Sequence, residues 1–407
     1  MKIPEINTVC FIGAGSMGCY NSLLAALAGY RVALYDISQE TLDQVDARQR
    51  QFGDSIVVAG LCLQQHIDQA LTLVTLHSEL ESIADSIDLV SESITEQLDI
   101  KRDTHAYLDS VFPPQTIITT NTSILLVSEI EDVLQRGDKF AALHSHLGAT
   151  LFDIVAGPRT SENTIDILQR YVVSLNCVPL ISQKENPGYI FNAMFGPLLG
   201  RGLKLVIEGI ATQEEVDLAW MLSRSSPIGP FGLMDYLGLN VIYDSWARER
   251  TEVERPDYQA RVLDFLAPFI EQNNLGVKTG KGFYNYPEAG YQQPDFYIPP
   301  QDLTTLDRVY NALICELILA AILIAQKQVA TADVIDQAWR VATSLDKGPF
   351  AILHEMGRAT FMARLQRLSE QGFCDAATVA LAQDYLHANR LLEDRAEPNV
   401  PPVNVKL

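Results

Sequence analysis

The chain has 407 residues, which is too long for one ordinary domain and long enough for two or three. Its 51 acidic residues outnumber its 30 basic ones and give a formal charge of −21, so neither nucleic acid nor an anionic membrane is expected as a partner. The six cysteines are scattered without a CxxC pair, and the N-terminus lacks the long apolar segment of a signal peptide. We therefore expect reduced cysteines, a cytoplasmic location and no metal site.

The first half of the chain alternates short apolar strands with helices. Residues 8–12 are apolar and β-branched and predict a buried strand, which is followed by a helix at 16–28 and a second strand at 32–35. Such a strand–helix–strand unit is typical of a parallel sheet. Further elements are expected as strands at 88–91, 116–119, 140–143 and 152–155 and as a helix at 98–108.

A glycine-rich turn follows the first predicted strand. Gly13, Gly15 and Gly18 form the pattern GxGxxG, with Ser16 and Met17 inside it. In dinucleotide-binding folds the first glycine permits a tight turn, the second lets the pyrophosphate approach, and the third lets helix and strand pack closely. The N-terminus of the following helix supplies free N–H groups for the phosphates. The alternative is a glycine-rich turn in an unrelated α/β protein.

An acidic residue, Asp36, ends the second predicted strand, 18 residues after Gly18. A carboxylate at this place accepts hydrogen bonds from the adenosine ribose. The next arginine is Arg48, so a 2′-phosphate would meet a carboxylate without a nearby cation. The sequence therefore predicts NAD rather than NADP as the cofactor.

The second half of the chain is mostly helical and contains an internal repeat. Residues 191–238 align with 310–357 at a constant offset of 119 and without a gap, and Gly-Pro-Phe occurs at 229–231 and again at 348–350. A chance match of this length is improbable, and two long copies do not make a solenoid. We expect an α/β Rossmann-type dinucleotide-binding domain followed by two repeated all-α domains.

The domain boundaries follow from these patterns. The most apolar stretch, 313–325, is too short to span a bilayer and contains Glu316, so it predicts a buried helix. Two copies of the helical domain on one chain predict a monomeric pseudo-dimer, with a homodimer as the alternative. We place the dinucleotide-binding domain at 1–185, the helical copies at 186–295 and 300–392, and a loosely ordered tail at 393–407.

Short motifs occur in a characteristic order along the chain. They include Glu92-Ser-Ile-Thr-Glu96, Thr120-Asn-Thr-Ser123, Pro187-Gly-Tyr-Ile-Phe-Asn192 and Lys278-Thr-Gly-Lys-Gly-Phe-Tyr284. In order and spacing these motifs resemble the 3-hydroxyacyl-CoA dehydrogenase family over nearly the whole chain. The resemblance implies a small-molecule acyl thioester as substrate, hydride transfer between its C3 and NAD, and a place in fatty acid metabolism.

The resemblance also implies a catalytic base. His144 ends a predicted strand and matches the family's catalytic histidine, a role that suits a side chain whose pKa lies near neutrality. Asp153 stands where the family has a glutamate that orients this histidine, and it is one methylene shorter. Two alternatives stay open, because His146 is a rival for the base and Asp153 could be an ordinary acid at a strand edge.

Four further residues are assigned by the same resemblance. Ser123 and Asn192 match the polar groups that hold the substrate oxygen, and Glu96 and Lys101 match residues that line the nicotinamide end of the cofactor site. Ser123 could instead cap a helix. Asn192 could have a structural role at a helix start, as its repeat partner Asn311 must have.

The chain departs from the family pattern in two places. The family usually has His-Phe-Phe-Asn-Pro at the base, whereas this chain has His-Ser-His-Leu-Gly at 144–148, followed by a loop about three residues shorter. Between residues 40 and 88 the only cations are Arg48 and Arg50, where family members often carry lysines that meet CoA phosphates. A carrier-tethered or free 3-hydroxy acid is therefore an alternative substrate, and an inactive NAD-binding structural or regulatory protein is the third hypothesis.

Overall fold

The computed structural model describes residues 2–248 and 258–389. These residues divide into two compact units. The first unit consists of residues up to 192 together with 327–344, and the second consists of 193–326 together with the described residues from 345 onward. The segment predicted to be a loosely ordered tail, 393–407, lies outside the described residues.

The first unit is built on an eight-stranded sheet in the order β3-β2-β1-β4-β5-β6-β7-β8. All neighbouring strands are parallel except β6 and β7, which pair antiparallel. The order from β3 to β6 is that of dinucleotide-binding sheets. The strands are β1 (Thr8–Ile12), β2 (Arg31–Tyr35), β3 (Val74–His77), β4 (Leu89–Glu92), β5 (Ile117–Thr120), β6 (Phe140–Ser145), β7 (Leu151–Ala156) and β8 (Val178–Ser182).

The strands predicted from apolar runs are all present, within two residues at each end. Two strands were missed, and each has a physical reason. β3 is a half-exposed edge strand, so its sequence lacks a strong apolar pattern. β8 contains Pro179 and lies at the opposite edge of the sheet, where a proline is tolerated.

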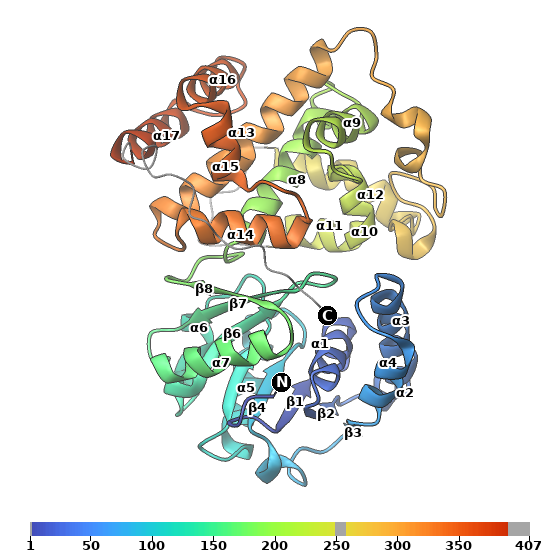
Figure 1. Cartoon of the computed structure of the whole chain (residues 1–407), viewed down its shortest axis with the longest axis vertical. Helices are drawn as coiled ribbons and strands as arrows, with labels where there is room; N and C mark the ends of the chain where they lie inside the picture. The colour runs from blue at the N-terminus through green and yellow to red at the C-terminus, as the bar shows by residue number, and fades with distance from the viewer. Residues whose placement is uncertain (1, 249–257, 390–407) are drawn as a thin grey trace. The chain divides into compact units, whose positions relative to one another are not determined.

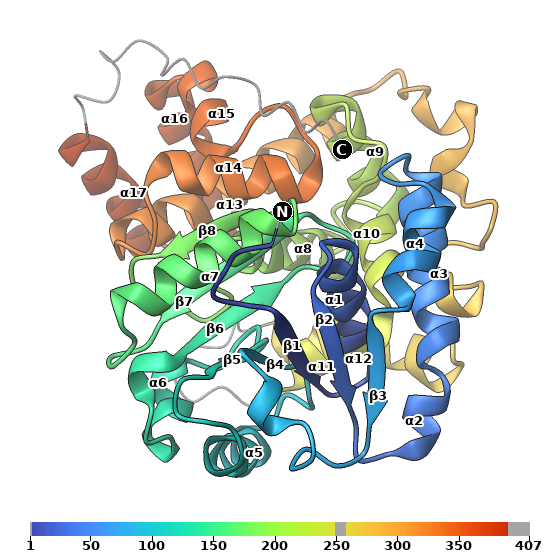
Figure 2. The ribbon, with the colours of Figure 1, turned by 60° about the horizontal axis from the view of Figure 1, so that its bottom comes forward.

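Helices cover both faces of the sheet (Figure 2). In β1, Val9 and Phe11 belong to one apolar core while Cys10 and Ile12 belong to the other, because a central parallel strand is buried on both sides. The first core includes residues of α1 and α7, and the second includes residues of α5 and α6. The helices are α1 (Ser16–Leu27), α2 (Gln39–Asp43), α3 (Val45–Val58), α4 (Gln64–Leu71), α5 (Leu98–Val111), α6 (Val127–Ile130) and α7 (Glu162–Ser174).

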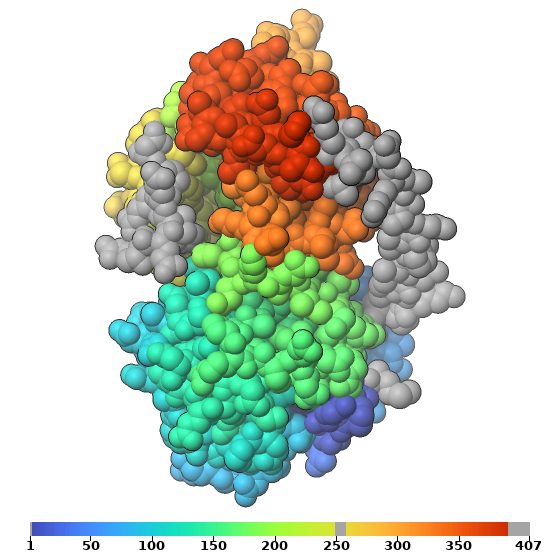
Figure 3. Space-filling view, turned by 90° about the vertical axis from the view of Figure 1, so that its left-hand side faces the viewer, coloured from blue at the N-terminus to red at the C-terminus, as the bar shows by residue number. Residues whose placement is uncertain are grey.

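A segment from late in the chain also belongs to the first unit. Helix α14 (Ala332–Thr343) packs against β7 and β8, and the orange segment lies directly against the green one in Figure 3. The backbone N–H of Gln183 donates to the carbonyl of Val329 (2.7 Å). The sheet therefore gains a covering helix that the sequence assigned to the second helical copy.

The second unit is helical in its described residues (Figure 1). Helix α13 is 23 residues long and apolar enough to cross a membrane, but 67% of its most apolar window is buried inside the protein, as in the core helix of a soluble protein. The buried helix predicted at 313–325 is present, but the helix is longer than predicted, because α13 begins at Thr304. The helices are α8 (Asn192–Ile207), α9 (Gln213–Arg224), α10 (Pro230–Leu237), α11 (Leu239–Ala247), α12 (Gln259–Glu271), α13 (Thr304–Gln326), α15 (Pro349–Met356), α16 (Arg358–Glu370) and α17 (Ala376–Ala388).

Two buried aspartates explain motifs in the helical half of the sequence. Asp217 accepts hydrogen bonds from the backbone N–H groups of Phe231 (2.7 Å) and Gly232 (2.9 Å) at the start of α10. Asp235 accepts one from the N–H of Tyr284 (2.9 Å), whose hydroxyl donates to Asp217 (2.9 Å). The Gly-Pro-Phe turn and the glycine-rich segment ending at Tyr284 are therefore held together by carboxylates.

Candidate active site

The glycine-rich turn lies between β1 and α1. Gly13 has φ +94°, which favours glycine, and a Cβ on Gly18 would lie 1.8 Å from the carbonyl oxygen of Gly13. A Cβ on Gly15 would meet nothing within 4 Å, so the space above this residue is open. Ser16 and Met17 begin α1, whose N-terminus has no side-chain cap, so its first N–H groups are available to a phosphate.

Asp36 lies just beyond β2 and is tied to this turn. Its carboxylate accepts hydrogen bonds from the N–H groups of Ala14 (2.8 Å) and Ser38 (2.9 Å). Arg48 on α3 donates to the carbonyl of Ala14 (3.1 Å). The sequence argument that no cation lies near the ribose site was therefore wrong, because the turn between β2 and α3 brings Arg48 back to the glycine-rich turn.

A histidine pair and a carboxylate occupy the antiparallel hairpin at the other side of the sheet. His144 on β6 stands directly opposite Asp153 on β7, and its Nδ1 lies 3.1 Å from Asp153 Oδ2. His146, just past the end of β6, places Nε2 2.8 Å from the same oxygen. All three side chains are buried, and Asp153 Oδ1 has no hydrogen-bond partner among the described residues.

Burial and charge act in opposite directions on these groups. Burial lowers the pKa of His144, His146 lowers it further, and the hydrogen bond to Asp153 raises it, with the net effect a pKa below the usual value. For Asp153, burial alone would raise the pKa, but the hydrogen bonds from the two histidines hold it below the usual value. The pair is therefore a neutral imidazole beside an ionised carboxylate near pH 7.

Ser123 lies in the loop after β5, and Glu96 fixes this loop. The Glu96 carboxylate accepts hydrogen bonds from the backbone N–H of Ser123 (2.9 Å) and from the Thr122 hydroxyl. Asn121 in the same loop accepts one from the backbone N–H of Ser145 (2.8 Å). The predicted residues Ser123 and Glu96 are thus in contact, and their loop is joined to the end of the strand that carries His144.

Lys101 is buried beneath this loop rather than at the surface of the site. It is 1% exposed, donates to Glu92 (2.6 Å) and lies 3.4 Å from Glu96. Glu92, the last residue of β4, also accepts hydrogen bonds from His105 (3.0 Å) and Thr120 (2.7 Å). Burial alone would raise the pKa of Glu92, but the hydrogen bond from His105 and the ion pair with Lys101 lower it to about 2.

The segment before α8 lies against the histidine pair. The ring of Tyr189 is 5.5 Å from that of His144, and the ring of Phe191 is 5.3 Å from that of His146. Asn192 follows directly as the first residue of α8 and belongs to the first unit. The structure therefore brings the segment that precedes Asn192 to the histidine pair, and Tyr189 and Phe191 are the residues that make the contact.

Sequence reasoning missed several residues of this site. Glu92 belongs to one of the motifs that carry the family resemblance and was assigned no role, although an acid at the end of an apolar strand is a recognisable signal. Tyr189 stands inside the motif at 187–192 and was assigned no role. His105 and Arg48 carry no such signal, because each lies on a helix and reaches the site only through the folded chain.

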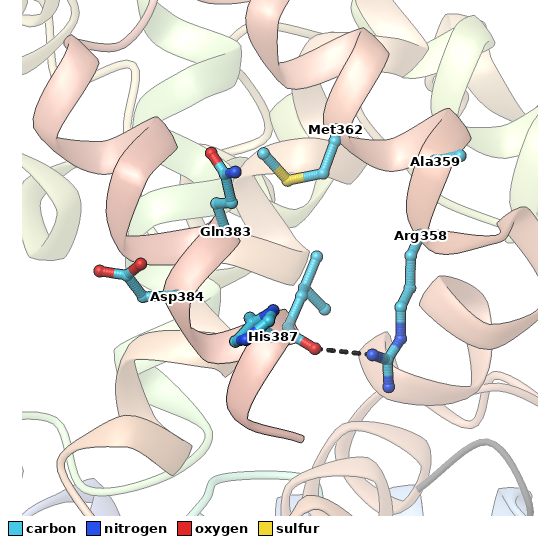
Figure 4. A pocket seen from close by; sticks show the side chains of 7 residues that line it. Arg358, Ala359, Met362, Gln383, Asp384 and His387 are labelled. Atoms are coloured by element: carbon cyan, nitrogen blue, oxygen red, sulfur yellow. Dashed lines mark hydrogen bonds between the residues drawn. The ribbon is translucent and has the colours of Figure 1, made fainter. Parts of the chain in front are cut away.

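A separate pocket lies between α16 and α17 in the second unit (Figure 4). Its arginine, Arg358, donates to the carbonyl of Leu386 (2.6 Å) at the end of α17, a favourable place for a cation. None of the predicted site residues lines this pocket. The guanidinium of Arg358 thus stabilises the C-terminal end of α17. We assign the pocket no role in the site described above.

The strand order, the glycine-rich turn and the acid after β2 define a dinucleotide-binding domain, and a histidine–carboxylate pair at the carboxyl end of β6 is typical of a dehydrogenase. The NAD-binding domain of 3-hydroxyacyl-CoA dehydrogenases matches residues 8–185, and the C-terminal domain of the same enzymes matches residues 188–286 and 309–398. The chain therefore belongs to the 3-hydroxyacyl-CoA dehydrogenase family. Its NAD-binding domain confirms the cofactor predicted from the sequence.

Individual relatives agree with this assignment. The human mitochondrial hydroxyacyl-coenzyme A dehydrogenase is 30% identical over 296 residues, which cover 69% of this chain and 91% of the human protein. The solved structure of a diketoreductase is 29% identical with a TM-score of 0.62, and covers 70% of this chain and 100% of that one. The structure of 3-hydroxybutyryl-CoA dehydrogenase from Escherichia coli K12 shares the fold over 94% of this chain and 98% of its own, at 21% identity and a TM-score of 0.74.

Proposed function

We propose that this protein catalyses the reversible oxidation of a 3-hydroxyacyl thioester to the 3-oxo form with NAD. The observation that carries the proposal is the His144–Asp153 pair, held opposite one another on β6 and β7 within an NAD-binding domain of this family. When bound, NAD accepts the hydride from C3 of the substrate or returns it. The remaining steps belong to residues of the chain.

His144 takes the proton of the C3 hydroxyl. A carboxylate only accepts hydrogen bonds, so His144 Nδ1 carries a hydrogen toward Asp153 and Nε2 is left with a free lone pair. Nε2 is then the atom that accepts the proton as the hydride leaves. Asp153 fixes this tautomer and stabilises the imidazolium that forms, which is the role of a carboxylate behind a histidine base.

Ser123 and Asn192 hold the substrate oxygen in this proposal. Ser123 donates its backbone N–H to Glu96, which fixes the loop that carries its hydroxyl. Asn192 stands at the first position of α8, where a side-chain amide can donate toward the same oxygen. Two donors at the C3 oxygen stabilise the charge that develops there during reduction of the 3-oxo group.

Glu96 and Lys101 position the nicotinamide end of the site. Because Lys101 is buried and paired with Glu92, we assign it to holding Glu96 rather than to contact with the cofactor. At the adenosine end, Asp36 has acceptor capacity left for the ribose hydroxyls. Ile37 beside it is 87% exposed and offers an apolar surface to the adenine ring.

Substitution of the two histidines tests the assignment of the base. His144→Gln should lower kcat by roughly a hundredfold or more and leave NAD affinity unchanged, because general base catalysis contributes about that much. His146→Gln should lower it much less, and His77→Gln on the distant strand β3 is the matched control. If His146→Gln lowers kcat far more than His144→Gln, His146 is the base. Normal kcat in both variants would exclude a histidine as the general base.

A second candidate is an oxidoreductase that oxidises a free 3-hydroxy acid or reduces a small dicarbonyl compound. Arg50, one of the two cations between residues 40 and 88, is paired with Asp46 and Asp68, and Arg48 is bonded to the glycine-rich turn. The segment thus presents little positive charge to CoA phosphates, and one relative of known structure is a diketoreductase. The two candidates are distinguished by the values of kcat/KM with acetoacetyl-CoA, acetoacetyl-pantetheine and acetoacetate. A large fall in kcat/KM for the two substrates without the CoA phosphates excludes this second candidate.

We also propose that the helical half is a duplicated domain, at 186–295 and 300–392. Helices α9 and α14 each have 12 residues and begin 119 positions apart, as do α10 and α15, which have eight residues each. Ser225 caps the C-terminus of α9 and Ser344 caps that of α14, and both residues have a left-handed backbone conformation. These matches support a pseudo-dimer within one chain, in which the second copy is structural.

A further inference from the structure

The hairpin of β6 and β7 gathers three side chains that are good ligands for a transition metal. His144, His146 and Asp153 each direct one ligand atom to a common place, and these three atoms lie within 4.8 Å of one another. All three residues are buried. Two imidazoles and one carboxylate are a donor set that zinc, cobalt and nickel accept.

The distances fit an ion with little rearrangement. In a tetrahedral zinc site with bonds of about 2.1 Å, neighbouring ligand atoms are roughly 3.4 Å apart. Here Asp153 Oδ2 lies 3.1 Å from His144 Nδ1 and 2.8 Å from His146 Nε2. Each of these two pairs needs to open by a few tenths of an ångström, because the antiparallel register already holds His144 and Asp153 opposite each other. The two imidazole nitrogens lie within 4.8 Å of each other and need to come to the same separation of roughly 3.4 Å.

A second observation points to a further ligand atom at this place. Asp153 Oδ1 is buried and has no hydrogen-bond partner among the described residues, although buried carboxylate oxygens are normally satisfied. An ion held by both carboxylate oxygens would satisfy it, whereas an ion bound through Oδ2 alone would not. His146 also stands where the family usually has phenylalanine, so the third ligand belongs to this chain rather than to the family pattern.

We propose that His144, His146 and Asp153 form a binding site for a divalent transition metal ion such as Zn²⁺, and that the ion inhibits the enzyme. The binding needs only the three ligands, whereas the inhibition rests on the proposed function. A neutral imidazole that binds metal through Nδ1 carries its one hydrogen on Nε2. His144 in that form has no lone pair at Nε2 and cannot take the proton of the substrate hydroxyl.

The binding is tested with Co²⁺ on the untagged full-length chain, without substrate. The parent protein should bind one Co²⁺ with the intense visible absorption of a four- or five-coordinate ion. His146→Phe should weaken this binding by about a hundredfold or more, because one of three protein ligands is lost. His77→Phe is the matched control and should bind Co²⁺ like the parent, since His77 lies on β3 at the far edge of the sheet.

Two results would overturn the site. One is a parent protein that shows only the weak bands of a six-coordinate ion, and the other is a His146→Phe variant that binds Co²⁺ as tightly as the parent. Folding of the variant is checked by circular dichroism and NAD binding. If the variant does not fold, the site is tested by NMR on the parent protein. Zn²⁺ should shift the ring proton signals of His144 and His146 and leave the ring proton signals of His77 unchanged.

Inhibition is measured separately with Zn²⁺ in the acetoacetyl-CoA assay. Micromolar Zn²⁺ should inhibit the parent reversibly, with recovery on chelation, and should inhibit His146→Phe far less. Tight Co²⁺ binding without inhibition by Zn²⁺ would contradict the inhibitory role alone. A protein that binds Co²⁺ as described but oxidises or reduces none of the acyl substrates would refute the proposed function and leave the metal site standing.

Discussion

Replacement of Glu92 by glutamine removes the charge at the centre of the buried network beneath the nicotinamide end of the site. Glu92 is fully buried, and Lys101 beside it is 1% exposed with its ammonium 2.6 Å away. In the variant the ammonium keeps only Glu96 at 3.4 Å as an ionic partner. A buried charge without its partner destabilises the folded state strongly.

The size of the effect follows from the pKa of Glu92. Its pKa falls from 4.5 to about 2 in the folded protein, and a difference of about 2.5 units corresponds to about 3 kcal/mol of stability. Loss of one partner of a buried pair costs about 3–5 kcal/mol, which agrees. For a unit of about 200 residues a loss of about 3 kcal/mol lowers Tm by roughly 6–12 °C at pH 7.

The stability that Glu92 contributes depends on pH in a direction that can be checked. Because the folded state lowers the pKa of Glu92, its contribution to stability is present above pH 4.5 and is lost as the pH falls toward 2. The gap in Tm between the parent and Glu92→Gln should therefore narrow below pH 4.5. Calorimetry from pH 7 to pH 3 measures both effects.

Two further variants make the test specific. Glu92→Gln combined with Lys101→Met should recover part of the lost stability, since the unpaired ammonium is removed. Glu79→Gln replaces an exposed acid and should leave Tm unchanged. Equal Tm values for the parent and Glu92→Gln at pH 7 would refute the reasoning, because they would mean that the buried ion pair contributes nothing.

Three more predictions concern the cofactor site and the helical half. Gly18→Ala should abolish NAD binding or folding, because its Cβ would lie 1.8 Å from the carbonyl oxygen of Gly13; normal binding in a titration would contradict this packing. Asp36→Ala should narrow the preference for NAD over NADP, since Arg48 is then left near the phosphate; unchanged affinities for both cofactors would show that Asp36 does not face the ribose. Truncation near Pro299 should yield a chain that aggregates or dimerises in light scattering, whereas a monomeric, soluble and fully active truncation would exclude a structural role for the second copy.

The parts of this protein that sequence reasoning recovered are those with strong local patterns. β1, the glycine-rich turn and the acid after β2 follow one another within 29 residues, so apolar runs and glycine spacing were enough to predict them. The antiparallel direction of β7 was not predicted, because an apolar run of six residues does not encode its direction. The proximity of Arg48 to the turn was missed for a similar reason, since it depends on how α3 packs against α1.

The candidate catalytic residues show the same limit. The sequence left His146 as a rival of His144 for the base, and the structure places both imidazoles on one carboxylate oxygen. The spacing of residues along the sequence cannot show that two side chains contact the same carboxylate oxygen. Lys101 was assigned by its position in a motif, and only the folded chain reveals that its ammonium is buried between two glutamates.

The antiparallel hairpin of β6 and β7 also bears on how such an enzyme changes over evolution. The register that sets His144 opposite Asp153 depends on the turn as well as on the hydrogen bonds of the sheet, because turn type and loop length fix the register of a hairpin. An insertion or deletion between residues 147 and 150 therefore has to keep this register if the reacting pair is to keep its spacing. Selection for a new substrate can replace side chains of the turn more readily than change its length, and the chemistry of proton transfer is then inherited unchanged.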